Sequence, residues 1–451
     1  MLLSWTVRRL SSAFLSGSIV CVCLLLVSPR HLRAEPRTWK YLNELSEAER
    51  RNIDLRTDTP RDTTLPYLPA EPYPFTAPYT AEEMGFRAME FPHIARWNFA
   101  MIEDFGSIMP TGSLTTAKTI VLAVYPEPEG LVAYFKARPG DIYARWLSQD
   151  TYPPENLGNQ MMMLQHRTDQ TATAKTDLFM YSPVLRRVRR FPQPRRQDRF
   201  PDQPMTFDDF LGRDAWEFTW RVIGTDVLTE TVRFPNTRKS LTLMTSDGEL
   251  KDIPVSSFKL MGDEYPHYTP EGGVPCYVVE AKAKSDWLND YYAPRIIYWL
   301  DQYAFYPLRT EMYAANGELV AMETRLAALY NPDLKERGYH NVITNWWNAQ
   351  LDFLSYGIHD SHRRRQWTEK DKEIYFNPDF MRRVWFPIPM KTLATVRTPE
   401  EMFLRPRLSR DKFPEERKVI VSPEVDMRIQ AQDAAGHLVF TETVADAKPE
   451  Q

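Results

Sequence analysis

In the stretch AWEFTWRVIG, residues 215–224, large apolar and polar side chains alternate from Trp216 to Val222. The apolar positions are Trp216, Phe218, Trp220 and Val222, and the polar positions between them are Glu217, Thr219 and Arg221. Because successive side chains of a strand point to opposite faces, this pattern predicts a strand buried on one face only. Such a strand needs a sheet and a covering layer, which favours a mainly β fold.

Further strand patterns lie on both sides of this stretch. Residues 118–125 (KTIVLAVY) and 131–137 (LVAYFKA) are expected to form two strands joined by the turn PEPEG. Residues 159–169 and 175–192 suggest a second pair, and residues 294–329 suggest three more strands. Asn316-Gly317 predicts a type I′ hairpin turn, in which both central residues have positive φ. The core is therefore expected to be a long antiparallel meander.

A helix is expected to begin at residue 80. Thr80 and Glu83 have the spacing of a capping box, in which the hydroxyl and the carboxylate bond to backbone N–H groups of the first turn. Pro92 should end or kink this helix near Glu90. The sequence after residue 335 mixes weak strand and helix patterns, and its last residues are polar.

These patterns divide the chain into four expected parts. Residues 1–34 form a signal peptide, residues 35–79 an extended Pro-rich segment, residues 80–335 the helix and antiparallel sheet, and residues 336–451 a mixed helix and strand extension with a frayed tail. The chain holds 36 Pro but only 17 Gly, which favours short elements joined by stiff turns.

The N-terminus predicts export. Arg8 and Arg9 precede an apolar run over residues 13–27, and small residues lead to an expected cleavage site near Ala34. The run is short for a membrane span of ~20 residues, although an uncleaved anchor stays open as the alternative. Residues 1–34 contain four Arg and no acidic residue, so cleavage makes the net charge more negative than −4. An acidic protein of this kind argues against nucleic-acid binding.

Candidate catalytic and metal sites are weak. Cys276 is the last cysteine after cleavage and lies in an apolar strand-like run, which indicates a buried structural thiol. His359 and His362 could supply two metal ligands, but no third ligand is nearby in the sequence, so a solvated loop is favoured. We expect no metal, no cofactor and no enzyme, with a hydrolase triad left open because triads assemble only in space.

Three motifs resemble a known family. They are YTAEEMGFRAMEFPHIARW from Tyr79, DLFMYSPVLRRVRRFP from Asp177, and IIYWLDQYAFYPLRTEMYAANGEL from Ile296. Together they resemble a family of secreted proteobacterial proteins of unassigned function, similar to the outer-membrane lipoprotein-sorting proteins, over roughly residues 80–387. The resemblance implies a strongly curved antiparallel sheet, an incomplete barrel wrapped over helices, in an α+β chain that is mainly β.

The resemblance also implies a location and a role. A periplasmic carrier of a lipid or another hydrophobic ligand is the leading hypothesis, with an envelope exporter as partner and peripheral contact with the membrane. The alternative is a structural or assembly factor with a filled core, which binds an inner- or outer-membrane protein through its surface. The chain is about twice as long as a lipoprotein chaperone, so its added segments could fill the hollow.

Two groups of residues are candidates for these roles. The aromatic residues expected to line the inner wall, as ligand contacts or as plain core, are Trp216, Phe218, Trp220, Tyr298 and Trp299. The charged residues expected to meet anionic headgroups or local carboxylates are Arg186, Arg187, Arg189, Arg190, Arg309 and Glu311. Arginines that point to both faces of one strand predict an edge or rim strand between Leu185 and Phe191. Arg309 and Glu311 should share one sheet face, where a solvent-side ion pair is favoured over a role at the mouth of a lipid hollow.

Overall fold

The structure is a computed structural model that describes most of the chain. The described residues are 39–89, 98–126, 131–201, 203–229, 240–244, 250–263, 265–329, 339–365, 369–382, 429–432 and 438–441. The predicted signal peptide, Pro92 and the residues between 382 and 429 lie outside these ranges.

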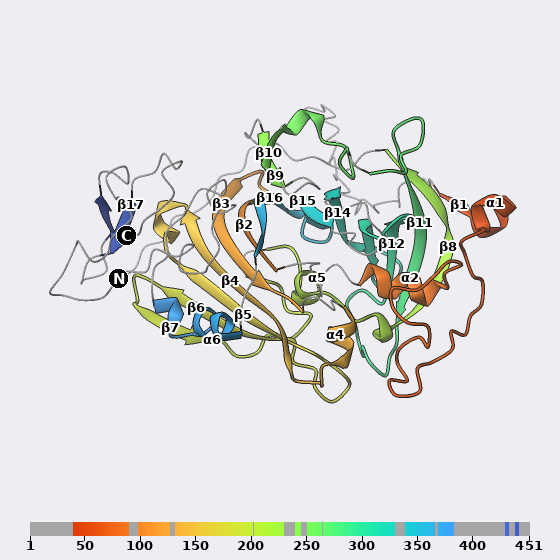
Figure 1. The fold of residues 1–451 in the computed structure, drawn as a ribbon, viewed down its shortest axis with the longest axis horizontal. Helices are drawn as coiled ribbons and strands as arrows, with labels where there is room; N and C mark the ends of the chain where they lie inside the picture. The colour runs from red at the N-terminus through yellow and green to blue at the C-terminus, as the bar shows by residue number, and fades with distance from the viewer. Residues whose placement is uncertain are drawn as a thin grey trace, which may run out of the picture. The chain divides into compact units, whose positions relative to one another are not determined.

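One antiparallel sheet dominates the described residues (Figure 1). From one edge to the other its strands are β1 (Lys40–Tyr41), β8 (Phe218–Leu228), β11 (Val274–Ala283), β12 (Arg295–Asp301), β13 (Pro307–Tyr313), β14 (Leu319–Leu329), β15 (Tyr339–Asn348), β16 (Phe353–Arg365), β2 (Asn98–Ile108), β3 (Leu114–Val124), β4 (Ile142–Tyr152), β5 (Gln160–His166), β6 (Thr176–Ser182) and β7 (Arg187–Arg190). Within the described residues β1 and β7 are not paired with each other, so the sheet is curved but open. The expected mainly β fold with an incomplete barrel is confirmed.

Both faces of this sheet are buried. On β11, Tyr277 and Val279 belong to one apolar cluster, whereas Cys276 and Val278 belong to another. The first cluster includes side chains of the helices α2 (Ala81–Ala88) and α4 (Leu131–Lys136). The second includes Phe258, Leu260, Met261 and Tyr265, together with Leu241 of the separate hairpin β9 (Ser240–Met244) and β10 (Leu250–Pro254).

A short helix, α5 (Phe207–Leu211), lies within the curve of the sheet (Figure 1). It connects opposite parts of the sheet, because Phe210 contacts Trp146 of β4 and the following Arg213 lies 3.6 Å from the sulfur of Met312 in β13. The remaining elements are η1 (Leu42–Glu44), α1 (Glu47–Arg50), η2 (Pro154–Asn156), η3 (Ala215–Glu217), η4 (Val255–Ser257), α6 (Glu369–Tyr375), η5 (Phe380–Arg382), and the isolated pair β17 (Ile429–Gln432) and β18 (Leu438–Thr441).

The predicted N-terminal helix is present. The Thr80 hydroxyl accepts from the backbone N–H of Glu83 at 3.2 Å, and the Glu83 carboxylate accepts from the N–H of Thr80 at 2.8 Å. The helix ends at Ala88, with Met89 as its C-cap, two residues before the expected end at Glu90.

Two local predictions are wrong. Residues 131–136 form the helix α4 instead of a strand, and buried Tyr134 and Phe135 attach it to the core. Its apolar run is too short for periodicity to separate a helix from a strand. At residues 314–318 only Gly317 has positive φ, 84°, and its N–H donates to the carbonyl of Ala314. The turn is therefore not type I′, because that turn needs positive φ at Asn316 as well.

The sheet also continues beyond residue 335. Strands β15 and β16 come from the segment expected to form a C-terminal extension. They lie in the middle of the sheet, where β15 pairs with β14 and β16 pairs with β2. Sequence neighbours and sheet neighbours differ here, since β2 pairs with a strand more than 240 residues further along the chain.

Candidate functional site

The segment from Thr206 to Glu217 forms two short helical turns inside the sheet. Thr206 and Asp209 make a capping box at the start of α5, and Gly212 ends that helix with φ 90°. Asp214 and Glu217 make a second capping box around η3. Each capping box accepts hydrogen bonds from backbone N–H groups that have no partner within a helix of this length. These bonds help to keep the two very short helices formed.

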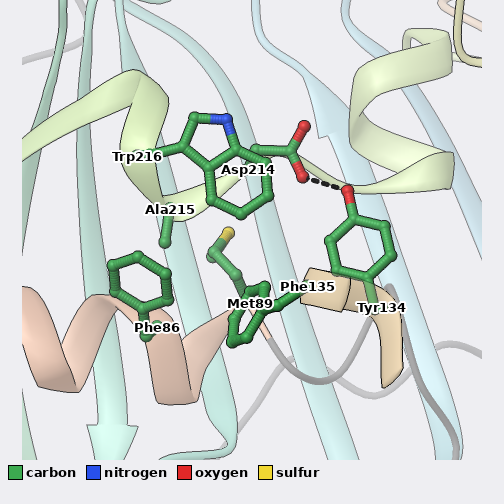
Figure 2. Close-up of a pocket in the computed structure, with 7 residues that line it drawn as sticks. All are labelled: Phe86, Met89, Tyr134, Phe135, Asp214, Ala215 and Trp216. Carbon is green, nitrogen blue, oxygen red and sulfur yellow. Dashed lines mark hydrogen bonds between the residues drawn. The ribbon is translucent and has the colours of Figure 1, made fainter. Parts of the chain in front are cut away.

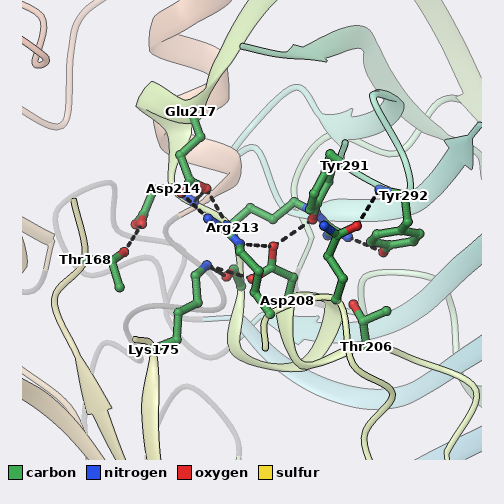
Figure 3. Close-up of polar contacts among 12 residues, drawn as sticks. Thr168, Lys175, Thr206, Asp208, Arg213, Asp214, Glu217, Tyr291 and Tyr292 are labelled. Atoms are coloured by element: carbon green, nitrogen blue, oxygen red, sulfur yellow. Dashed lines mark hydrogen bonds and ion pairs between the residues drawn. The ribbon is translucent and has the colours of Figure 1, made fainter. Parts of the chain in front are cut away.

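Asp208 is the centre of a buried ion network (Figure 3). Its carboxylate lies 3.1 Å from Lys175 Nζ and accepts from Arg196 Nε at 2.7 Å and from the Tyr291 hydroxyl at 2.8 Å. Asp208 is fully buried. Burial alone raises the pKa of this carboxyl, but Lys175, Arg196 and Arg213 outweigh it and lower the pKa to about 2. Asp208 is therefore ionised at neutral pH.

Two arginines extend the network. Arg196 donates to both carboxylate oxygens of Glu217, at 2.7 and 2.8 Å, in the two-pronged geometry that arginine favours. Arg213 donates to the Tyr291 and Tyr292 hydroxyls at 2.7 and 2.6 Å. It also forms an ion pair with Asp209. The network thus joins the residue before β6, helix α5, η3 and the loop before β12.

Asp214 connects this network to an aromatic pocket. The hydroxyl of Tyr134 donates to Asp214 Oδ1 at 2.5 Å, and the hydroxyl of Thr168 donates to Oδ2 at 2.6 Å. Burial raises the pKa of Tyr134 well above its ordinary value, and the Asp214 carboxylate raises it further. Tyr134 is thus a neutral hydrogen-bond donor.

The aromatic pocket lies between α2, α4 and η3 (Figure 2). It is lined by Phe86, Met89, Tyr134, Phe135, Asp214, Ala215 and Trp216, and these side chains pack so closely that no room for a water molecule is left between them. Ordinary ligand pockets begin at ~300 Å³. Any ligand, even a single ring, would therefore have to displace a lining helix or side chain.

A buried arginine forms one wall of the same region. The guanidinium of Arg167 lies 4.3 Å from the ring centre of Trp216 and 5.3 Å from that of Tyr134. Its Nη2 donates to the Tyr67 hydroxyl at 2.7 Å. Arg167 is only 1% exposed. The charge is held by aromatic faces, an arrangement that stabilises cations where water is excluded.

The five predicted aromatic residues do not share one face. Trp216 lies in η3, and its neighbours include Phe86, Tyr134 and Phe135. Phe218, Trp220 and Tyr298 belong to the same side of the sheet as Trp216. Trp299 lies on the opposite side, where its indole donates to Asp226 at 2.9 Å. Trp299 cannot line an inner wall that contains Tyr298, because adjacent strand residues point to opposite faces.

The predicted arginines near residue 190 lie at one end of the strand order. Strand β7 contains Arg187, Arg189 and Arg190, and Arg186 precedes it in a turn with φ 48°. All four are exposed. Arg190 pairs with Asp177 at 2.6 Å, so one of them has a local carboxylate partner.

Arg309 and Glu311 share a face and form an ion pair, as expected. This pair is partly buried, because the Arg309 guanidinium lies 5.0 Å from the ring centre of Trp299. The pair therefore belongs to the side of the sheet opposite the aromatic pocket.

Candidate metal and thiol sites gain no support. The residues that the structure describes contain no cluster of three or more His, Cys, Asp or Glu with metal-binding geometry. His359 lies in β16, 3.2 Å from Glu103, while the side chain of His362 is outside the described set. Cys276 is fully buried in β11, which raises the pKa of its thiol. Among the described helices, none is long and apolar enough to cross a bilayer.

Sequence reasoning missed the ion network. Its members Asp208 and Arg213 are separated by at least 78 residues from Tyr291 and Tyr292, and the four match no catalytic pattern. The available signal was local: Thr206 and Asp209 have capping-box spacing, and Gly212 follows at the distance of a helix end. That pattern predicts α5 but not its partners.

Several solved structures are similar to this chain. A Vibrio parahaemolyticus domain assigned to outer membrane lipoprotein sorting has 14% identity and a TM-score of 0.45, covering 67% of this chain and 98% of its own. A DUF1329 protein from Desulfovibrio piger has 11% identity and a TM-score of 0.42, covering 66% and 95%. A LolA superfamily protein from Nitrosomonas europaea has 12% identity and a TM-score of 0.38, covering 67% and 99%. Likenesses this distant carry no argument about function.

Sequence comparison gives the family. None of the curated proteins matches the chain. The family model described as a protein of unknown function (DUF1329) matches residues 40–382. Because that match covers more than half of the sequence, the chain belongs to the DUF1329 family.

Proposed function

We propose that this protein binds a hydrophobic ligand, such as a lipid chain, in the periplasm and performs no chemistry on it. The observation that carries the proposal is the pocket between α2, α4 and η3, which combines apolar walls with the single carboxylate of Asp214. Apolar pockets with few polar groups are typical of binding sites. The expected signal peptide supports a periplasmic location.

Ligand entry would require movement of a covering helix. The side chains between α2, α4 and η3 leave no room for a water molecule, so a lipid chain cannot enter without such a movement. Helix α2 has only eight residues, so few contacts would have to be broken to move it. Displacing α2 would join the pocket to the face of β8 that carries Phe218 and Trp220.

The test compares two alanines in the same apolar cluster. Ala215 lines the pocket, whereas Ala293 is equally buried but lies outside it. The protein purified from the cell envelope of its host should carry lipid, detected by mass spectrometry after solvent extraction. It should also bind hydrophobic fluorescent probes. Ala215→Leu should reduce both signals, and Ala293→Leu should not. If Ala215→Leu fails to fold, Ala215→Val adds less volume for the same comparison.

The absence of stoichiometric lipid and of probe binding in the unaltered protein would contradict this function. A specific observation then favours the second candidate, an assembly factor with a filled core. Trp216 already contacts four other aromatic rings, namely those of Tyr67, Phe86, Tyr134 and Phe135. Capture of an exporter or another membrane protein from solubilised envelopes, without bound lipid, would support that candidate.

A further inference from the structure

Four hairpin turns lie in a row at one end of the sheet. They join β15 to β16 (residues 349–352), β2 to β3 (109–113), β4 to β5 (153–159) and β6 to β7 (183–186). These eight strands are consecutive neighbours in the sheet, and each pair is antiparallel, so the four turns share one end. We name this end the turn rim. At ~4.8 Å between strands, it is about 34 Å long.

The turn rim concentrates exposed apolar side chains. Seven of the twelve large apolar side chains that are exposed in the described residues lie in these turns or next to them: Met109, Leu114, Tyr152, Leu157, Val184, Leu185 and Leu351. Val184 is 84% exposed and Leu185 is 52% exposed. Every one of the four turns contributes at least one of them. Exposed apolar groups that gather on one surface mark an interaction site.

Positive charge accompanies the most exposed turn. Arg186, Arg187 and Arg189 are exposed, and the described residues contain no ion-pair partner for them, in contrast to Arg190 with Asp177. The rim also holds two exposed acidic residues, Glu155 and Asp352, and Asp352 accepts from the indole of Trp347. Unpaired arginine next to exposed Val184 and Leu185 matches an apolar layer covered by anionic headgroups.

The form of the rim favours a bilayer over a protein partner. Its apolar side chains come from separate turns that protrude one beside another; the β4–β5 and β6–β7 turns touch at Gly158, where an added Cβ would lie 3.1 Å from Pro183. A protein partner would need a pocket for each turn, whereas lipid chains adapt to all of them at once. Tyr152 fits the interfacial level, where tyrosine is enriched.

We propose that the turn rim docks on the surface of a bilayer rich in anionic lipid, with Val184 and Leu185 entering the acyl boundary and the neighbouring arginines contacting headgroup phosphates. This docking does not depend on a ligand in the aromatic pocket. Four shallow turns place the sheet end-on against the membrane, so the protein binds peripherally and reversibly.

Vesicle co-sedimentation tests this proposal with the full protein. The unaltered protein should sediment with vesicles that contain phosphatidylglycerol and much less with pure phosphatidylcholine. Val184→Asp with Leu185→Asp should abolish binding to both. Arg187→Glu with Arg189→Glu should weaken binding to the anionic vesicles about tenfold or more, since each arginine near such a surface contributes to affinity. Added salt should have the same effect as the arginine change.

Matched controls lie away from the rim. Leu55 is 59% exposed and Arg138 is exposed at another part of the chain, so Leu55→Asp and Arg138→Glu should leave vesicle binding unchanged. Equal losses in rim and control variants, or no sedimentation of the unaltered protein, would overturn the proposal. It would also be overturned if the rim variants kept vesicle binding but lost association with a purified membrane protein.

Discussion

The indole of Trp220 in β8 lies directly against Gly85 of α2: a Cβ atom added at Gly85 would sit 2.3 Å from Trp220 Cδ2. The Trp220 ring is held in place because its Nε1 donates to the carbonyl of Ala215 at 2.7 Å. Only glycine allows α2 to approach the sheet this closely, so this contact sets the distance between the helix and the sheet beside the aromatic pocket.

Replacing this glycine should therefore destabilise the protein. We expect Gly85→Ala to lower the free energy of unfolding by about 1–3 kcal/mol, because the added methyl group overpacks the contact. Urea unfolding measures the change. The double variant Gly85→Ala with Trp220→Leu should be less destabilised than the sum of the two single changes. If the two changes in unfolding free energy simply add, the contact between Gly85 and Trp220 does not contribute to stability.

The capping box of α2 gives a second prediction. Thr80→Ala removes the hydroxyl that accepts from the Glu83 N–H and also bonds to Thr59 at 3.1 Å, so it should cost about 1–2 kcal/mol of stability. Thr80→Ser keeps the hydroxyl and should cost much less. Thermal unfolding of the three proteins compares them, and similar losses in both variants would point to the methyl group instead.

Asp208 should make the protein sensitive to acid. The surrounding cations lower its folded-state pKa from 3.8 to about 2, so its stabilisation is complete above the unfolded pKa and is lost as pH falls through the folded one. Asp208→Asn leaves Lys175 and Arg196 buried without their shared carboxylate and should cost about 3 kcal/mol near neutral pH. The difference in the free energy of unfolding between the unaltered protein and the Asp208→Asn variant, measured with urea, should become smaller as pH falls from 4 toward 2. A difference that does not change with pH would contradict the ionised state assigned to Asp208.

Asp150, near the turn rim, should affect the pH dependence of stability in the direction opposite to Asp208. Burial raises the pKa of this carboxyl from 3.8 to about 7, so the folded protein binds the proton more tightly than the unfolded chain. Stability should therefore fall as pH rises between these values. Asp150→Asn should stabilise the protein above pH 7 and have little effect near pH 4. We expect about 2 kcal/mol, since the side chain keeps some contact with solvent. Thermal unfolding at the two pH values decides.

The local patterns of the sequence predicted the main architecture. Alternation over residues 215–224 predicted the face shared by Phe218, Trp220 and Val222, and the Thr80–Glu83 spacing predicted the start of α2. These predictions succeed because strand alternation and helix caps depend on residues a few positions apart. The family resemblance added the open, curved sheet, which the fold confirms.

Only the tertiary structure determined the features that depend on contacts between distant parts of the chain. It made a helix of residues 131–136, because packing on Trp216 selects a helical turn for a run too short to specify its own form. It placed Trp299 opposite Tyr298, put β15 and β16 in the centre of the sheet, and brought Asp208 to Lys175, Arg196 and Tyr291. The sequence by itself determined the periods and caps of this protein; contacts between distant segments determined its ion network, its pocket and its turn rim.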